Sequence, residues 1–211
     1  MQIAILIFDG LTALDAIGPY EVLSRLPGAE LRFVAKEAGP KRTDTGALGI
    51  EADLALAELD APEVVLVPGG KGNRPLMGDA EVLDWLRSVH ESTTWTTSVC
   101  TGALVLGAAG ILDGKRATTH WAYIDRLREL GADPVAERVV EDGKVITAAG
   151  VSAGIDMALT LAARIAGDEV AQAIQLGIEY DPVPPFDAGS PAKAPAEVIE
   201  LVRTLERSQP E

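Results

Sequence analysis

The sequence predicts an α/β protein in which helices cover both faces of a mostly parallel central sheet. Three short apolar runs, at residues 2–8, 64–67 and 94–99, have the aliphatic or β-branched composition of strands that are buried on both faces. Each run ends at a polar or glycine-rich turn, and segments with helical patterning lie between the runs. Strands that alternate with helices form parallel sheets, because the chain crosses back over the sheet as a helix.

The remaining elements follow from local patterns. The expected strands cover residues 2–8, 29–35, 64–67, 94–99, 116–119, 134–141 and 144–148. The expected helices cover residues 18–25, 80–91, 102–109, 123–130, 155–165, 168–176 and 194–207. Asp142-Gly143 is a hairpin signal between the last two strands, whereas residues 39–49 are polar and turn-rich. Because active sites of parallel sheets lie at the carboxyl ends of the strands, catalytic groups are expected just after strands.

Composition and charge narrow the class of protein. The 211 residues, 47% of them hydrophobic, predict one globular domain spanning residues 1–211. A net charge of −14 argues against nucleic acid and anionic membrane surfaces as partners. Without a basic, apolar leader or a membrane-spanning apolar run, the chain is expected in the cytoplasm. The two histidines and the one cysteine lack metal-site spacing, so no metal or cofactor is expected.

Cys100 lies where the strand expected at 94–99 meets the helix expected at 102–109. Gly102 allows the backbone to turn tightly there, and a strand, a sharp turn and a helix form the elbow that hydrolases use to present a nucleophile. The helix N-terminus points its positive end at the sulfur, which favours thiolate. A lone buried cysteine can also serve only as a small hydrophobic residue. The elbow context favours the nucleophile.

Three further candidates follow predicted strands. Asp15 lies among apolar neighbours in the approach to the helix expected at 18–25; its structural alternative is a loop or capping aspartate. Gly69-Gly70 follows the strand at 64–67, where backbone N–H groups can face an anion or a carbonyl, without dinucleotide or P-loop spacing. His120 stands at the end of the strand at 116–119, where a purely structural histidine is the alternative. With Cys100, these groups are expected to converge on one rim of the sheet.

Two other titratable residues are interpreted as surface residues. Glu21 falls on the first expected helix, where an exposed glutamate is the ordinary case. His90 falls near the end of the helix at 80–91 and is expected at the surface.

Three motifs resemble the PfpI superfamily, which has a class I glutamine amidotransferase-like, flavodoxin-like fold. They are Val99-Cys100-Thr101-Gly102, Val67-Pro68-Gly69-Gly70 and Ala117-Thr118-Thr119-His120-Trp121. The run Phe8-Asp9-Gly10-Leu11-Thr12-Ala13-Leu14-Asp15-Ala16-Ile17-Gly18-Pro19 is most similar to the isonitrile hydratases of that superfamily. The resemblance covers residues 2 to about 187 and implies a flavodoxin-like three-layer sandwich. Protease-type members have a histidine after the cysteine, and Thr101 at that position argues against a peptidase or glutaminase triad.

The resemblance to isonitrile hydratases implies a site and an assembly. The cysteine that matches Cys100 is the nucleophile, and the residues that match Asp15 and Thr101 assist it. The expected substrate is a small-molecule isonitrile, and the expected assembly is a homodimer with its sites near the interface. Thr101 has a structural alternative as a helix N-cap.

The expected chemistry begins when the Cys100 thiolate attacks the terminal carbon of R–N≡C and forms a thioimidate. Asp15 acts as general acid and then as base for the water that releases an N-substituted formamide. Backbone N–H groups of Gly70 and Thr101 are expected to stabilise developing charge, and Gly69 and His120 to line the substrate site. Two alternatives remain: a glyoxalase- or deglycase-type cysteine enzyme that acts on reactive carbonyls, and a redox sensor with Cys100 oxidised to sulfinate.

Gly150 belongs to a run of small residues, 149–154, at the start of the helix expected at 155–165. Small residues permit close approach of the backbone but hold a helix end weakly. Two interpretations stay open: tight static packing against the sheet, and a helix that shifts when Cys100 carries an intermediate.

Overall fold

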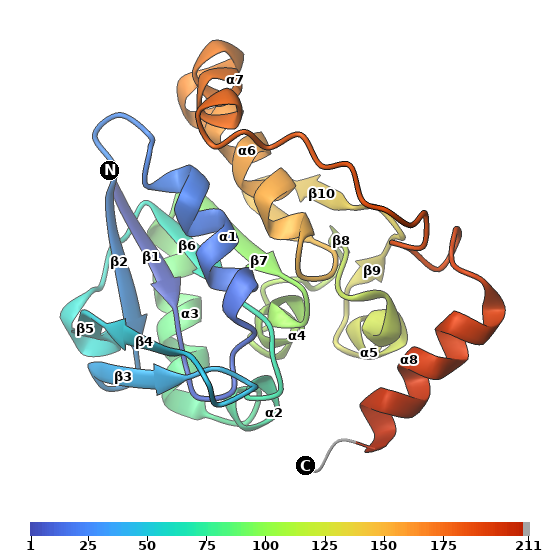
Figure 1. The fold of residues 1–211 in the computed structure, drawn as a ribbon. Helices are drawn as coiled ribbons and strands as arrows, with labels where there is room; N and C mark the ends of the chain where they lie inside the picture. The colour runs from blue at the N-terminus through green and yellow to red at the C-terminus, as the bar shows by residue number, and fades with distance from the viewer. Residues whose placement is uncertain (209–211) are drawn as a thin grey trace. The chain divides into compact units, whose positions relative to one another are not determined.

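A seven-stranded sheet forms the centre of the computed structural model, which describes residues 1–208 (Figure 1). The chain divides into two compact units, Met1–Ile178 and Glu179–Glu211, and the sheet belongs to the first. The strands lie in the order β10-β11-β7-β6-β1-β2-β5. Their bounds are β1 Gln2–Leu6, β2 Glu30–Ala35, β5 Leu54–Ala55, β6 Val64–Val67, β7 Trp95–Val99, β10 Val139–Asp142 and β11 Val145–Ala148.

All neighbouring strands of this sheet are parallel except the hairpin of β10 and β11. The hairpin turns at Asp142-Gly143, as predicted, with Asp142 opposite Val145. A separate hairpin pairs β3 (Gly39–Arg42) with β4 (Gly49–Ala52) in the stretch predicted to be turn-rich. The prediction of a mostly parallel sheet between helices, in a flavodoxin-like sandwich, is therefore confirmed.

Helices cover both faces of the sheet (Figure 1). On one face α1 (Ala13–Leu23) packs against α6 (Ala153–Ala166), and α6 packs against α7 (Asp168–Gly177). On the other face α3 (Ala80–Ser92) packs against α4 (Gly102–Ala108), which also contacts the short α2 (Asn73–Leu76) and α5 (Ile124–Glu129). Two short 3₁₀ helices complete the unit, η1 (Leu56–Glu58) and η2 (Trp121–Tyr123).

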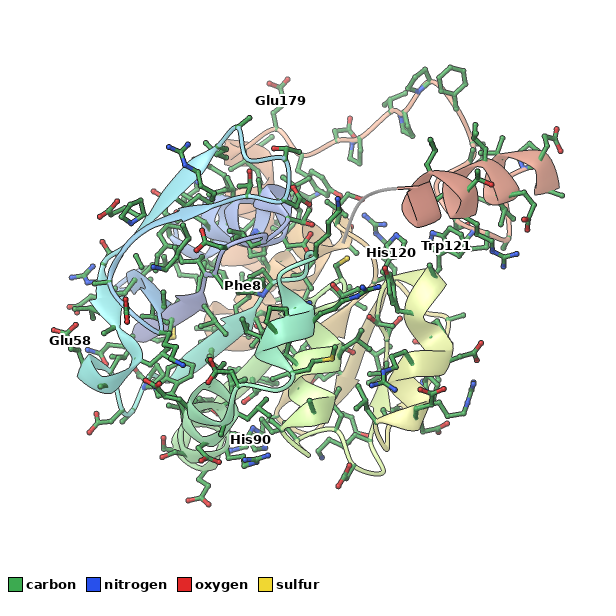
Figure 2. The ribbon with its side chains drawn as sticks, turned by 90° about the horizontal axis from the view of Figure 1, so that it is seen from below. Phe8, Glu58, His90, His120, Trp121 and Glu179 are labelled. Carbon is green, nitrogen blue, oxygen red and sulfur yellow. The ribbon has the colours of Figure 1, made fainter. Side chains whose placement is uncertain are left out.

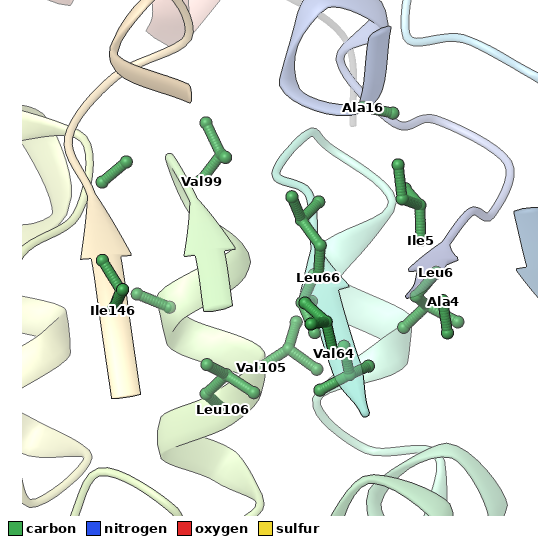
Figure 3. Close-up of a cluster of buried hydrophobic side chains, with 14 of the residues drawn as sticks. Ala4, Ile5, Leu6, Ala16, Val64, Leu66, Val99, Val105, Leu106 and Ile146 are labelled. Atoms are coloured by element: carbon green, nitrogen blue, oxygen red, sulfur yellow. The ribbon is translucent and has the colours of Figure 1, made fainter. Parts of the chain in front are cut away.

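The core lies between the sheet and these helices. Figure 3 shows Val105 and Leu106 of α4 beside Val64 and Leu66 of β6. All four side chains are fully buried. The apolar residues of β1 and β6 are buried on both faces, as expected for central parallel strands.

The first helix begins earlier than predicted. α1 starts at Ala13, so Gly18 and Pro19 lie inside it and Asp15 lies in its first turn, not in the approach. Pro19 lacks an N–H and disfavours a helix interior. Packing outweighs this cost, because α1 buries one face against α6, where Gly18 approaches Ile155 closely.

Two other predictions are corrected. The strand expected at 116–119 shrinks to β8 (Arg116–Ala117), which pairs with β9 (Asp133–Pro134) in a separate two-stranded sheet. His120 therefore does not follow a strand of the central sheet. His90 is half-buried rather than exposed, because its Nδ1 lies 2.7 Å from Thr96 Oγ1. Burial lowers the pKa of His90, and Lys144 lowers it further. Glu21 is exposed, as predicted.

The described part of the second unit, residues 179–208, contains one helix, α8 (Ala196–Ser208), close to the predicted 194–207. A proline-rich segment without regular secondary structure, which includes residues 181–186, precedes it. Within residues 1–208, no helix combines the length and the apolar character that a bilayer crossing requires. The same part of the chain contains no group of three His, Cys, Asp or Glu side chains arranged to hold a metal ion.

Candidate active site

Cys100 occupies a strained elbow between β7 and α4. Its backbone has φ of +56°, in the left-handed region that residues with a Cβ rarely adopt. Three hydrogen bonds hold it there: Cys100 N–H is shared between the carbonyls of Ala148 and Ala149, at 3.1 and 2.9 Å, and Thr119 Oγ1 donates to Cys100 O at 2.8 Å. The side chain is only 6% exposed. The backbone therefore fixes the sulfur above the carboxyl end of the sheet.

Gly102 makes the elbow possible. A Cβ at this position would lie 2.0 Å from the carbonyl oxygen of Val67 at the end of β6. Because that oxygen belongs to the backbone, no rearrangement of side chains could relieve the clash. The start of α4 therefore rests directly on the backbone of the neighbouring strand. This contact explains why the sequence has glycine two residues after the cysteine.

The Gly69-Gly70 turn is fastened to the loop that follows β1. Thr12 N donates to Gly69 O at 2.9 Å, and Gly70 forms a bridge with Leu11. Gly70 has φ of +133°, and a Cβ on it would lie 2.4 Å from Gly10 O. Only glycine fits this close approach, which brings the two turns together at one rim of the sheet.

Asp15 is fully buried beside Cys100. Its Oδ2 accepts a hydrogen bond from Gly69 N at 2.8 Å, while Oδ1 has no hydrogen-bond partner among the described residues. Burial raises the pKa of Asp15 to about 7, and the negative charge of Asp44 adds to this rise. Hydrogen bonding to Gly69 N–H and to Cys100 lowers the pKa, but by less. A carboxyl group with this pKa carries a proton over part of the neutral range, and Oδ1 is the oxygen free to hold it.

The pKa of the Cys100 thiol is raised to about 12, first by burial and then by the charge of Asp15. The backbone N–H groups of Val151 and Thr101 face the sulfur and lower this pKa, but they are outweighed. The N-terminus of α4 therefore acts on the pKa of Cys100 in the predicted direction, towards thiolate, but burial and the charge of Asp15 outweigh it. The reason is that burial in a low-dielectric site and a neighbouring carboxylate both disfavour a second negative charge.

Thr101 connects the glycine turn to the elbow. Its Oγ1 accepts hydrogen bonds from Gly70 N at 3.1 Å and from Asn73 Nδ2 at 2.9 Å. Thr101 is the N-cap residue of α4, but its side chain does not form a capping hydrogen bond with that helix. Thr101 Oγ1 and Asp15 Oδ2 both lie 2.7 Å from the point that a Cβ on Gly69 would occupy. Asp15, Thr101, Gly69, Gly70 and Cys100 thus form one cluster.

His120 lies against the loop that precedes α6. Its Nδ1 accepts a hydrogen bond from Ala122 N at 3.4 Å, and its ring lies 5.6 Å from that of Trp121 and 6.0 Å from that of Tyr123. Figure 2 labels His120 and its neighbour Trp121. A Cβ on Gly150 would lie 2.7 Å from Cδ2 of the same imidazole. Because Val151 N–H faces the sulfur of Cys100, His120 supports the loop before α6 that carries this donor.

Three residues of the site were not predicted from the sequence. Asn73 directly follows the glycine-rich turn, and its position there could have suggested it. Val151 contributes only a backbone N–H, with φ of +23°, so its side chain type gives no indication. Asp44 accepts from Thr12 Oγ1 at 2.7 Å and comes from a hairpin loop that looked like an ordinary turn.

Comparison with known proteins places the chain in a family. Residues 1–164 match the model of the DJ-1/PfpI family, and the chain belongs to it. The isonitrile hydratase of Pseudomonas putida is 49% identical over 203 residues, which cover 96% of this chain and 89% of that protein. A deglycase of Thermococcus kodakarensis, TK1284, is 27% identical over 70% of this chain and 89% of that protein.

Solved structures agree with this assignment. A ThiJ/PfpI family protein from Pseudomonas syringae superimposes with a TM-score of 0.94 at 40% identity, over 98% of this chain and 86% of that chain. Drosophila melanogaster DJ-1beta superimposes with a TM-score of 0.78 at 26% identity, over 86% of this chain and 98% of that chain. The elbow and sheet described above are therefore those of a DJ-1/PfpI protein.

Proposed function

We propose that this protein hydrates isonitriles to N-substituted formamides. The observation that carries the proposal is the pair of Cys100 and Asp15, a nucleophile and a buried carboxyl group with a pKa of about 7, at the elbow of an α/β sheet. The 49% identity to an isonitrile hydratase over nearly the whole chain supports the same substrate class. The chain is proposed to act in the cytoplasm, as one functional domain over residues 1–211 and without a cofactor.

In the first step, protonated Asp15 donates its proton to the terminal carbon of R–N≡C, and the Cys100 sulfur bonds to that carbon. The thiol proton passes to the carboxylate that has just formed, which gives R–N=CH–S–Cys100 and restores the acid. This order removes the need for a resting thiolate, in agreement with the raised pKa of the thiol. The N–H groups of Val151 and Thr101 stabilise charge on sulfur as the proton leaves.

In the second step, Asp15 protonates the thioimidate nitrogen and takes a proton from the water that adds to the carbon. Collapse of the resulting adduct breaks the C–S bond, and Asp15 relays the hydroxyl proton to sulfur. R–NC and H₂O thus give R–NH–CHO and the free thiol. Asp15 gives and regains one proton in the first step and two in the second, a role for which a pKa near the working pH is best suited. Gly70 N–H is already donated to Thr101 Oγ1, so it acts on the substrate only through that hydroxyl.

One screen tests the proposed function against its alternatives. Purified protein is incubated separately with an isonitrile, with methylglyoxal and with peroxide. Formamide production supports the proposal. Turnover of methylglyoxal alone would favour the glyoxalase- or deglycase-type reaction, for which the similarity to a deglycase is the pointer. Sulfinate formation at Cys100 without turnover of either substrate would indicate a redox sensor.

The protein is expected to be a homodimer in solution, with its sites near the interface. This expectation comes from the family resemblance alone, because contacts within a single chain give no information on a dimer. Multi-angle light scattering at micromolar concentration should give twice the chain mass of 22.1 kDa. A monomer mass at that concentration would contradict it.

Gly150→Thr is expected to disturb the loop that precedes α6. A Cβ at Gly150 meets the His120 ring at 2.7 Å, so the ring or the loop must move, and Val151 N–H moves with the loop. If α6 shifts during turnover, the substitution should slow a step after attack, and rapid-mixing absorbance should show the thioimidate accumulating. Under static packing, the melting temperature falls while the relative rates of the two steps stay unchanged. A Gly177→Ala variant, whose added Cβ meets nothing within 4 Å, is the control.

A further inference from the structure

A buried asparagine lies beside the candidate catalytic pair and has no role in the mechanism above. Asn73 is the one asparagine of the chain and is only 3% exposed. Its Nδ2 donates to Thr101 Oγ1 at 2.9 Å, whereas its Oδ1 has no hydrogen-bond partner among the described residues. A buried amide with an unpaired oxygen destabilises a fold. An apolar side chain would suit stability better, so a functional reason for the amide is needed.

The position of this amide is fixed by the backbone around it. Asn73 N donates to Gly70 O at 3.1 Å, and Gly72 N donates to Gly10 O at 3.1 Å. A Cβ on Gly72 would lie 2.0 Å from Asp9 O, so the loop rests directly on the turn that follows β1. The start of α2 therefore holds the amide of Asn73 against Thr101.

Counting the hydrogen bonds of Thr101 shows what the amide does. A threonine hydroxyl has two lone pairs and one hydrogen. Gly70 N–H and Asn73 Nδ2 occupy both lone pairs, at 3.1 and 2.9 Å. The hydrogen of the hydroxyl must then point away from both donors, and none of the hydrogen bonds among residues 1–208 uses it. Thr101 Oγ1 lies on the same side of Gly69 as Asp15 Oδ2. The hydroxyl hydrogen of Thr101 therefore lies within the cluster that holds the reacting groups.

We propose that Asn73 is a positioning residue, which by donating to Thr101 Oγ1 makes the Thr101 hydroxyl a hydrogen-bond donor to the substrate nitrogen. This inference rests on the proposed function. The nitrogen of an isonitrile has no lone pair to offer, but the nitrogen of the thioimidate has one. The hydrogen bond therefore forms only as attack proceeds, so it accelerates the chemical step without strengthening substrate binding. Its loss should lower kcat and leave KM nearly unchanged.

Asn73→Asp tests the direction of this hydrogen bond at almost constant side-chain size. An ionised carboxylate accepts a hydrogen bond from the Thr101 hydroxyl and turns its hydrogen away from the substrate. A protonated carboxyl group can still donate, as the amide does. We therefore compare the kcat of N73D with that of the wild type at the same pH. At high pH we expect the kcat of N73D to be roughly 10- to 100-fold lower, and at low pH we expect this difference to disappear.

Two further variants separate orientation from structural damage. Asn73→Leu removes the donor without adding an acceptor, so its kcat relative to the wild type should be reduced by a factor that does not vary with pH. Thr101→Val removes the hydroxyl, and adding N73D to T101V should cause no further loss at high pH. Melting curves of all variants identify any that fail to fold. Wild-type kcat for N73D at high pH, or losses that multiply in the double variant, would overturn the inference.

A second readout does not depend on the substrate. Neutron diffraction from crystals of the deuterated wild type should show the Thr101 deuterium pointing away from Asn73 and from Gly70 N. A deuterium directed at Asn73 would overturn the inference whatever the enzyme's substrate is. Failure of the wild type to convert any isonitrile, with the deuterium placed as expected, would instead count against the proposed function and leave the positioning role supported.

Discussion

Cys100→Ala should abolish formamide production, with kcat reduced by about 10³-fold or more, while the protein stays folded. The structure places the only thiol of the chain at the elbow. Alanine keeps the Cβ and the backbone hydrogen bonds of Cys100, so the melting temperature should change little. Intact-mass spectrometry of wild type quenched during turnover should show one added substrate mass, and the alanine variant should show none.

Ser98→Ala is the matched control for this result. Ser98 lies two residues before Cys100 in β7 and is fully buried, yet its hydroxyl oxygen has no hydrogen-bond partner among the described residues. Removing it should leave both kcat and stability close to wild type, since no hydrogen bond is lost. Comparable formamide production by Cys100→Ala and Ser98→Ala would refute the covalent mechanism.

Asp15→Asn should remove turnover and, at pH 8, raise stability. The amide oxygen can still accept the hydrogen bond from Gly69 N, but the amide cannot exchange protons with the substrate. The folded pKa of Asp15 is about 7, above its ordinary value of 3.8, so folding favours the protonated form. Stability is therefore lost as pH rises from about 4 to about 7, by up to about 4 kcal/mol if no other group relaxes. A neutral amide avoids this loss, and urea titrations at pH 5 and pH 8 measure it.

The same pKa predicts the pH dependence of the wild type. Because the first step requires protonated Asp15, kcat/KM should fall as pH rises through about 7. Asp44→Asn removes a negative charge that contributes to the raised pKa, so it should move this fall to lower pH by a fraction of a unit. A profile that rises through pH 7 would show that Asp15 must be ionised at the start and would contradict the proposed order of proton transfers.

Much of the fold could be predicted from the sequence because buried parallel strands have a strong local signal. The run at 64–67 and the hairpin at Asp142-Gly143 match the structure closely. The start of α1 was missed because the penalty for Pro19 is local, whereas the packing of α1 on α6 that outweighs it is tertiary. The strand before His120 was overextended because β-branched residues favour strands even where no neighbouring strand of the central sheet is available.

The sequence could predict those residues of the candidate site that have a reactive side chain and also follow a strand of the central sheet. Cys100 and Asp15 each follow a central strand, and the rule for carboxyl ends of parallel strands brings them together. The protonation state of Cys100 was not predictable, because it depends on burial and on a carboxylate 85 residues earlier in the chain. Val151 contributes one backbone N–H, which no side-chain type reveals. Asn73 contributes one amide hydrogen bond, and only its place directly after the glycine-rich turn could have suggested it.

The left-handed backbone at Cys100 has a consequence for how this enzyme tolerates evolutionary drift. A residue with a Cβ at φ of +56° raises the energy of the native state by about 1–2 kcal/mol, and glycine would relieve that strain. The position proposed to carry the nucleophile is thus one where selection for stability alone favours another residue. In a laboratory population kept folded but released from selection for activity, glycine at position 100 should be enriched early. Loss of catalysis would then accompany a gain in the stability of the elbow.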